Sequence, residues 1–168
     1  NQHADPPGPA GYHTHSAVMI EANLDDMTPQ LFENLMEKLL EVGALDVWFV
    51  PIQMKKNRPG MLLQVLAHPT SVDDLAKLIF RESTSIGLRT YEVTKRMLQR
   101  EKMIVQTPYG PVGVKLAYLG GERVNALPEY EDCRELSNQS GIPLKEIYTA
   151  ACVSASEQIK SSSAAEST

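Results

Sequence analysis

An α+β fold is predicted by the order in which two kinds of apolar pattern occur along the chain. Some segments alternate apolar and polar residues, as strands do, and others repeat apolar residues at helical spacing. Glycine, proline and polar turns separate these segments. The chain has 168 residues, of which 42% are hydrophobic, and a chain of this size can bury a core without disulfides.

The first predicted strand covers residues 18–24, where apolar side chains occupy alternate positions. Thr28 and Pro29 then offer a helix N-cap and a first-turn proline, so a helix is predicted to start there. Its apolar residues follow helical spacing up to Gly43, a residue type that commonly ends helices.

Two further strands, 45–54 and 61–68, are predicted to form a hairpin around the turn Lys-Lys-Asn-Arg-Pro-Gly. Ser71 is predicted to cap a second helix, and a long strand is expected over residues 86–98. The order over residues 17–98 is therefore β-α-β-β-α-β. This order predicts a ferredoxin-like core, in which two helices cover one face of a four-stranded antiparallel sheet.

Beyond this core, residues 102–107 and 112–119 predict an added β-hairpin. Two C-terminal helices are expected to begin near Pro128 and Pro143. The other face of the core sheet needs a cover, which these elements or a partner subunit would supply. A homo-oligomer is therefore expected, and a trimer or a hexamer is plausible.

The predicted boundaries are a flexible His/Pro/Gly linker over 1–16, one domain over 17–160 and a disordered tail over 161–168. The chain does not start with methionine, so a fragment or a processed product is expected. Only two cysteines are present, which indicates reduced thiols and a cytoplasmic protein.

The net charge of −5 argues against a broad nucleic-acid-binding surface, although it leaves room for a local basic pocket. No apolar run approaches the roughly 18 residues of a membrane span. We therefore expect neither nucleic acid nor a membrane as a partner.

Two segments carry candidate ligands for a hard cation. Asp25 and Asp26 follow the first strand, where a turn lets adjacent carboxylates converge; the alternative is helix capping. Glu129, Glu131 and Asp132 open a predicted helix, where acids also suit the helix dipole. Positions 129 and 132 lie on one helix face and could share an ion.

Two other segments carry candidate anion ligands. Lys55, Lys56 and Arg58 place three cations on one hairpin turn, a set that suits a polyphosphate; the alternative is a solvated turn. The second set joins small hydroxyl residues, whose loop could present backbone N–H groups, to arginines on the following strand. Its members are Ser83, Thr84, Ser85, Arg89 and Arg96, and the alternative is an ordinary loop.

Histidines form a last candidate group. His3, His13 and His15 lie in the predicted linker, where imidazoles could hand over nickel, copper or zinc. The alternative is an incidental linker composition. No Ser-His-Asp triad, phosphate-binding P-loop or dinucleotide fingerprint is recognisable.

Four strings in this order resemble a known family. They are residues 23–29 (NLDDMTP), 51–60 (PIQMKKNRPG), 82–89 (ESTSIGLR) and 128–133 (PEYEDC). The resemblance covers roughly residues 17–155 and is to the C-terminal domain of the nickel insertion proteins that mature the nickel-pincer cofactor of lactate racemase.

The resemblance implies a nickel chelatase, or cyclometallase, of the lyase class. Such proteins insert Ni²⁺ into pyridinium-3,5-bisthiocarboxylic acid mononucleotide, and CTP goes to CMP and pyrophosphate with Mn²⁺ or Mg²⁺. It also implies a further N-terminal domain, so that the activity of this fragment is incomplete. The catalytic residues stay unknown.

On this interpretation the nucleotide-binding residues are the hairpin cations with the hydroxyl loop and its arginines, and the metal ligands come from the acidic pairs. Which carboxylates bind the ion, and whether nickel contacts this domain, are left open. Two rival functions are a ferredoxin-like small-molecule-binding regulatory or oligomerisation module, and a nickel storage or delivery protein that uses the histidines.

Overall fold

The computed structural model describes residue 8 and residues 10–165. The chain divides into two compact units, and the boundary lies between Lys95 and Arg96. The N-terminal unit is Thr14–Lys95; the C-terminal unit runs from Arg96 onward and includes the described residues before Thr14. This division differs from the single domain predicted over 17–160. Its physical basis is that the buried apolar side chains form two separate clusters.

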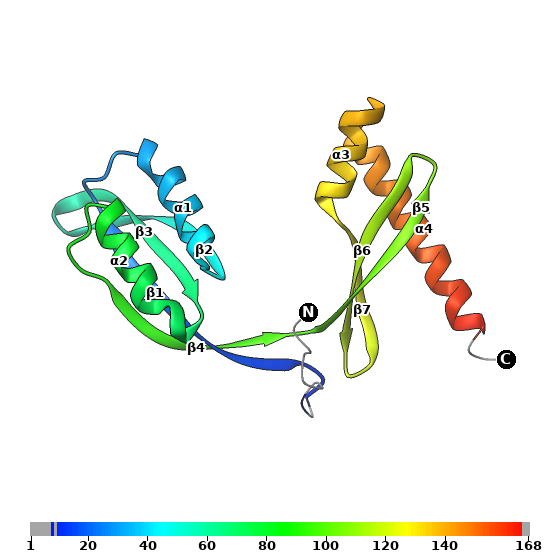
Figure 1. Cartoon of the computed structure of the whole chain (residues 1–168), viewed down its shortest axis with the longest axis horizontal. Helices are drawn as coiled ribbons and strands as arrows, with labels where there is room; N and C mark the ends of the chain where they lie inside the picture. The colour runs from blue at the N-terminus through cyan, green and yellow to red at the C-terminus, as the bar shows by residue number, and fades with distance from the viewer. Residues whose placement is uncertain (1–7, 9, 166–168) are drawn as a thin grey trace. The chain divides into compact units, whose positions relative to one another are not determined.

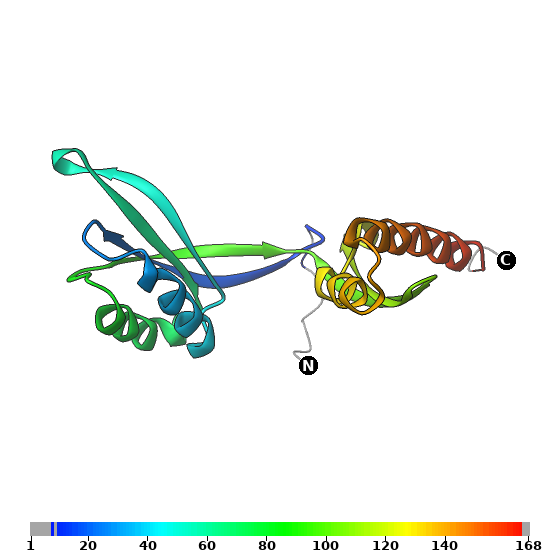
Figure 2. The ribbon, with the colours of Figure 1, turned by 90° about the horizontal axis from the view of Figure 1, so that it is seen from above.

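The N-terminal unit is a four-stranded sheet with two helices on one face (Figures 1 and 2). The sheet order is β2-β3-β1-β4, and β3 pairs antiparallel with both β1 and β2. This is the predicted ferredoxin-like arrangement, which is confirmed. The elements are β1 (His13–Leu24), α1 (Gln30–Val42), β2 (Asp46–Met54), β3 (Arg58–Ala67), α2 (Val72–Glu82) and β4 (Arg89–Met97).

Alternate side chains of β1 and of β3 point into the core of this unit. Ile20, Ala22 and Leu24 are buried on β1, while their neighbours fall on the opposite sheet face. Each helix adds two fully buried residues four positions apart, which lie on the same helix face. The fully buried residues on the other elements are Leu35, Leu39, Leu63, Val65, Ala67, Leu75 and Ile79.

The helix ends follow the sequence in part. Gly43 ends α1 in the left-handed conformation, with φ 109°, and its N–H reaches the carbonyls of Leu39 and Leu40. The predicted N-cap at Thr28 is wrong, because Pro29 holds that position and offers no side-chain hydrogen bond. Ser71 is at the N-cap of α2, but its side chain makes no capping bond.

The C-terminal unit is a three-stranded antiparallel sheet, β5-β6-β7, with two helices. The predicted hairpin and both predicted helices are present. The strand β7 was not predicted, since most of its residues are exposed and show no clear alternation. The elements are β5 (Gln99–Thr107), β6 (Gly110–Leu119), β7 (Glu122–Pro128), α3 (Tyr130–Ser140) and α4 (Leu144–Ala165).

Both predicted flexible ends need correction where they are described. Strand β1 begins at His13, inside the predicted linker 1–16, and the Gly11 carbonyl just before it accepts a hydrogen bond from Gly120 N. Helix α4 continues to Ala165, so residues 161–165 are helical. Alanine favours helix, and extending a helix costs less than starting one. Residues 1–7, 9 and 166–168 lie outside the described part.

In the described part of the chain, no helix combines the length and the apolar character needed to cross a membrane.

Gly60 is predicted to be essential for the close approach of β3 to the end of β1. A Cβ at this position would lie 2.9 Å from the Leu24 carbonyl oxygen and 2.9 Å from the Met54 sulfur. Because a backbone atom cannot rotate away, Gly60→Ala should lower the free energy of unfolding by about 1–3 kcal/mol. Urea unfolding followed by the fluorescence of Trp48, the single tryptophan, measures this unit.

The matched control is Gly87→Ala. A Cβ there meets nothing within 4 Å, so this change should be neutral or slightly stabilising. Equal stability of the two variants would contradict the proposed clash.

Candidate functional site

Three of the sequence strings come together at one end of the N-terminal unit. The segment after β1 meets the β2–β3 hairpin, where Asp25 Oδ2 lies 3.4 Å from Arg58 Nη1. It also meets the loop after α2, where Thr84 donates a hydrogen bond from Oγ1 to Asp26 Oδ1. The pairing of β1 with β3 explains why Asp25 lies near Arg58. Leu24 pairs with Met61, which brings the residue after β1 close to the start of β3. A predicted metal-binding carboxylate, Asp25, and a predicted phosphate-binding cation, Arg58, therefore lie beside each other although they come from different strings.

The hairpin tip is a single 3₁₀ turn over Lys55–Asn57. Lys56 and Asn57 both adopt left-handed backbone conformations, with φ of 60° and 57°. Such conformations are uncommon for residues other than glycine, and they cluster at functional sites. The side chains of Lys55, Lys56 and Arg58 are exposed, so the turn presents three cations to solvent.

The predicted hydroxyl loop is held by its own side chains. Ser83 Oγ donates to the Ile79 carbonyl at 2.6 Å and accepts from Ser85 N at 3.2 Å. Ser85 Oγ donates to the Gly87 carbonyl at 2.6 Å. Together with Thr84, these residues fix the loop between α2 and β4. All three hydroxyls are therefore used inside the protein.

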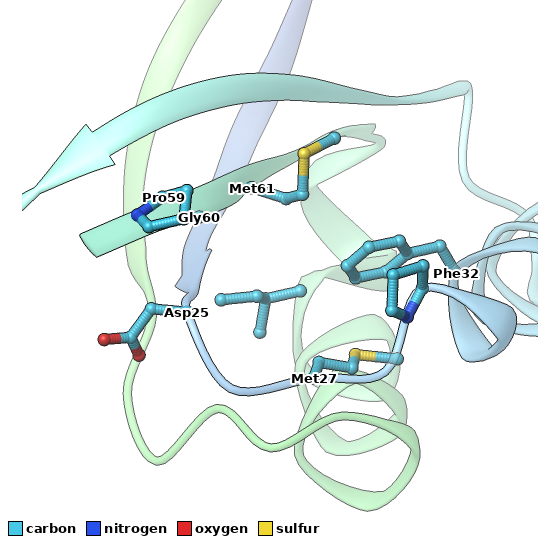
Figure 3. Close-up of a pocket in the computed structure, with 8 residues that line it drawn as sticks. Asp25, Met27, Phe32, Pro59, Gly60 and Met61 are labelled. Carbon is cyan, nitrogen blue, oxygen red and sulfur yellow. The ribbon is translucent and has the colours of Figure 1, made fainter.

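A shallow hollow of about 210 Å³ lies between the segment after β1, the start of α1 and the start of β3 (Figure 3). Most of the residues that line it have apolar side chains, and Asp25 is the one charged residue among them. Figure 3 shows the Asp25 carboxylate at the edge, directed away from Phe32. The lining residues are Leu24, Asp25, Met27, Pro29, Phe32, Pro59, Gly60 and Met61. The hollow is large enough for one aromatic ring.

A polar network that the sequence did not predict crosses the sheet beside this site. Glu21 on β1 accepts hydrogen bonds from Arg89 Nε at 2.8 Å, Tyr91 Oη at 2.8 Å and Gln64 Nε2 at 2.7 Å. Gln64 in turn accepts from Trp48 Nε1 at 2.7 Å. All four strands contribute. An acidic residue between Ile20 and Ala22 was the available signal, but its partners become visible only with the register.

The surroundings of Glu21 set its charge. Burial, the largest influence, would raise the pKa of Glu21, but hydrogen bonds from Tyr91 and Gln64 and the nearby Arg89 together lower it below the ordinary 4.5. The hydrogen bond to Glu21 is the main factor that raises the pKa of Tyr91, with burial second. At neutral pH the carboxylate is ionised and the phenol is protonated.

The remaining acidic candidates lie in the C-terminal unit, and each has a partner there. Glu129 Oε2 lies 2.9 Å from Lys115 Nζ, Glu131 pairs with Arg134, and Asp132 Oδ2 accepts from Gly113 N at 2.7 Å. Across the residues that the structure describes, no three His, Cys, Asp or Glu side chains are grouped closely enough to hold a metal.

The other predicted residues are dispersed. Arg96 is the first residue of the C-terminal unit, near the end of β4. His13 and His15 lie in β1 rather than in a linker, and His3 is outside the described residues. Cys133 and Cys152 are free thiols, and burial is the main factor that raises the pKa of Cys133.

Comparisons with known proteins point to one family. A model of the nickel insertion protein family matches residues 7–148. A pyridinium-3,5-bisthiocarboxylic acid mononucleotide nickel insertion protein of Thermotoga sp. (strain RQ2) is 51% identical over 140 residues, which are 83% of this chain and 35% of that protein. A putative nickel insertion protein of Myxococcus xanthus (strain DK1622) is 45% identical over 133 residues, or 79% of this chain and 34% of that protein.

Two solved structures are similar over most of this chain. LarC2, the C-terminal domain of a cyclometallase involved in the synthesis of the NPN cofactor of lactate racemase, matches in its apo form with a TM-score of 0.82 and 43% identity, covering 86% of this chain and 99% of that chain. Protein MK0293 of Methanopyrus kandleri AV19 matches with a TM-score of 0.64 and 27% identity, covering 86% of this chain and 90% of that chain. The chain spans about a third of the length of the curated relatives it matches.

Glu21→Gln is predicted to destabilise the N-terminal unit in a pH-dependent way. A lowered folded-state pKa contributes stability that is present above the ordinary value of 4.5 and is lost as pH falls through the folded value. At pH 7 the free energy of unfolding of the variant should fall by about 1.5–3 kcal/mol, the range expected for hydrogen bonds to a charged group. The deficit should shrink below pH 4.5 when urea unfolding is followed at several pH values.

Glu37→Gln is the control, since Glu37 is exposed on α1. Its unfolding free energy should stay close to that of the unmodified chain across the same pH range. A Glu21→Gln deficit of constant size down to pH 3.5, roughly a unit below the ordinary value, would refute the proposed charge effect.

Proposed function

Because the chain belongs to the nickel insertion protein family, we propose that it is the CTP-binding part of a nickel insertase. The whole enzyme would insert Ni²⁺ into pyridinium-3,5-bisthiocarboxylic acid mononucleotide and convert CTP to CMP and pyrophosphate. Nickel and the pyridinium mononucleotide are substrates on this proposal. The similarity to the cyclometallase C-terminal domain, which spans 99% of that chain, supports the assignment of this region.

The meeting of opposite charges at one end of the N-terminal unit is the observation that carries the proposal. A nucleoside triphosphate needs several cations for its phosphates and oxygen ligands for a bridging divalent ion. The exposed hairpin offers Lys55, Lys56 and Arg58, and Asp25 lies against Arg58. The chain as a whole carries a net charge of −5, so this concentration of cations is a local departure.

Asp25 and Asp26 are the favoured ligands for Mn²⁺ or Mg²⁺, because Asp25 lies against Arg58 of the basic hairpin and Asp26, the next residue, is held by Thr84 of the hydroxyl loop. Two carboxylates are enough, since such ions take most of their remaining ligands from phosphate oxygens and water. Glu129, Glu131 and Asp132 stay predicted alternatives, and each already has a partner within its own unit.

The hydroxyl loop and the arginines complete the proposed nucleotide site. Thr84 is held to Asp26, and the loop leads directly into Arg89 on β4. Ser83 and Ser85 would act by keeping the loop in shape, since their hydroxyls bond to the backbone. Arg96 stays a predicted contact that no observed neighbour supports.

The apolar hollow is the proposed seat of the cytosine ring. It adjoins the hairpin, because Pro59 and Gly60 line it and directly follow Arg58 in sequence. Apolar walls with few polar groups are typical of small-molecule sites. A ring in the hollow would leave the phosphates free to reach the cations of the hairpin.

The wider context is proposed in the same way. The remaining two-thirds of the relatives' length is expected to include an N-terminal domain that works with this one. A cytoplasmic location agrees with the two free thiols. A homo-oligomer, such as a trimer or a hexamer, would cover the sheet face that α1 and α2 leave open.

Reversing the hairpin charges is predicted to abolish CTP binding. Lys56→Glu combined with Arg58→Glu replaces two phosphate ligands by repulsive carboxylates and should weaken Mn-CTP binding at least about 100-fold. Isothermal titration calorimetry with CTP and Mn²⁺ measures the dissociation constant. The matched control is Lys77→Glu with Lys145→Glu, two exposed lysines outside the predicted site, which should change it little.

Absence of binding by the unmodified chain at millimolar CTP would refute the proposed function. Survival of full affinity in the double hairpin variant would instead remove the hairpin from the phosphate site.

Binding of the cytosine ring in the hollow is predicted to be detectable by comparing the affinities for two ligands, CTP and inorganic triphosphate. With Mn²⁺ present, CTP should bind more tightly than inorganic triphosphate, because only CTP places a ring in the hollow. Met61→Gln adds a polar amide to the half-buried wall and should weaken CTP binding about 5–10-fold. Its affinity for inorganic triphosphate should stay unchanged, and an equal loss for both ligands would contradict a base in the hollow.

A further inference from the structure

Glu21 is an unusual residue for the middle of this sheet. It is the buried charged residue of the described chain, with 7% of its surface exposed. A buried carboxylate is costly unless hydrogen-bond donors replace the lost water. Three donors do so here, from Arg89, Tyr91 and Gln64.

The sheet register fixes the place of this carboxylate. Glu21 lies opposite Gln64, and Gln64 lies opposite Trp48, so three strands align their polar side chains in one row. Gln64 is itself held by the indole of Trp48. Since each member has a partner, the row leaves Glu21 little freedom to move.

Arg89 is oriented by two oxygen acceptors on β1. Its Nε donates to Glu21 Oε2 at 2.8 Å, and its Nη1 donates to Asn23 Oδ1 at 3.1 Å. Its Nη2 has no hydrogen-bond partner among the residues described, and 53% of the side chain is exposed. The guanidinium is therefore fixed on one edge and open to solvent on the other.

This arrangement suits an anion receptor. Asn23 is only two residues before Asp25, so the fixed guanidinium lies along β1 towards the proposed nucleotide site. A guanidinium that is already oriented loses less side-chain entropy when it binds an oxyanion. An exposed pair between flexible side chains would offer no such gain.

We propose that Glu21 is a positioning residue, which holds Arg89 so that its open edge receives a phosphate oxyanion of the nucleotide. The inference rests on the proposed function, because it assumes that a triphosphate binds at this end of the unit. Glu21 does not touch the ligand; its effect passes through Arg89.

A double-mutant cycle tests this coupling. Arg89→Ala should weaken Mn-CTP binding about 10-fold or more, and Glu21→Gln should weaken it several-fold, as measured by calorimetry. In the Arg89→Ala background, Glu21→Gln should have no further effect, because the residue that it positions is gone. Circular dichroism and Trp48 fluorescence confirm that each variant is folded.

Glu37→Gln is the matched control, since it makes the same substitution at an exposed position of α1 and leaves the contact between Glu21 and Arg89 intact. It should change CTP affinity less than about twofold. A loss caused by Glu21→Gln that persists in the Arg89→Ala background would overturn the inference and assign Glu21 a purely structural role.

The outcomes separate this inference from the proposed function. Full CTP affinity in Arg89→Ala, together with loss in the hairpin variant, would overturn the role of Arg89 and Glu21 while the nucleotide site stands. No CTP binding by the unmodified chain would overturn both.

Discussion

Strand β1 is the constraint on which the N-terminal unit depends. It is an inner strand of its sheet, with apolar side chains on one face and polar side chains on the other. Ile20, Ala22 and Leu24 face the two helices and are buried. Glu21 and Asn23 face the other way and hold Arg89. Because side chains alternate on a strand, shifting the pairing register of β1 by one residue would place Glu21 in the apolar core. The same shift would move the apolar side chains to the open face.

The same strand also decides where the candidate site forms. As β1 ends, the chain turns into α1, and the antiparallel partner β3 begins beside it at the hairpin. The loop after α2 returns to this end through Thr84. A protein with an acidic average charge can therefore concentrate cations locally, because topology gathers residues that are far apart in sequence.

The sequence was sufficient for the order of the elements and for the helix end at Gly43, because these features have local signals. It also indicated the strings that meet at the site. It was insufficient to predict the role of Glu21. One acidic residue in an apolar strand can be interpreted only when its neighbours Gln64, Arg89 and Tyr91 are known. Strand β7 was missed for a related reason: pairing with β6, rather than its own pattern, makes it a strand. The two separate cores likewise depend on packing that is not local.

The left-handed backbone at Lys56 has an evolutionary consequence. Glycine adopts this conformation without steric cost, whereas another residue loses about 1 kcal/mol or more. Selection for folding stability alone would therefore favour glycine at the hairpin tip. A lysine there suggests that a positive charge at this point outweighs the strain. Replacing Lys56 by glycine to relax this turn would remove that charge, so on the proposed function thermal stability and phosphate affinity are opposed at this position.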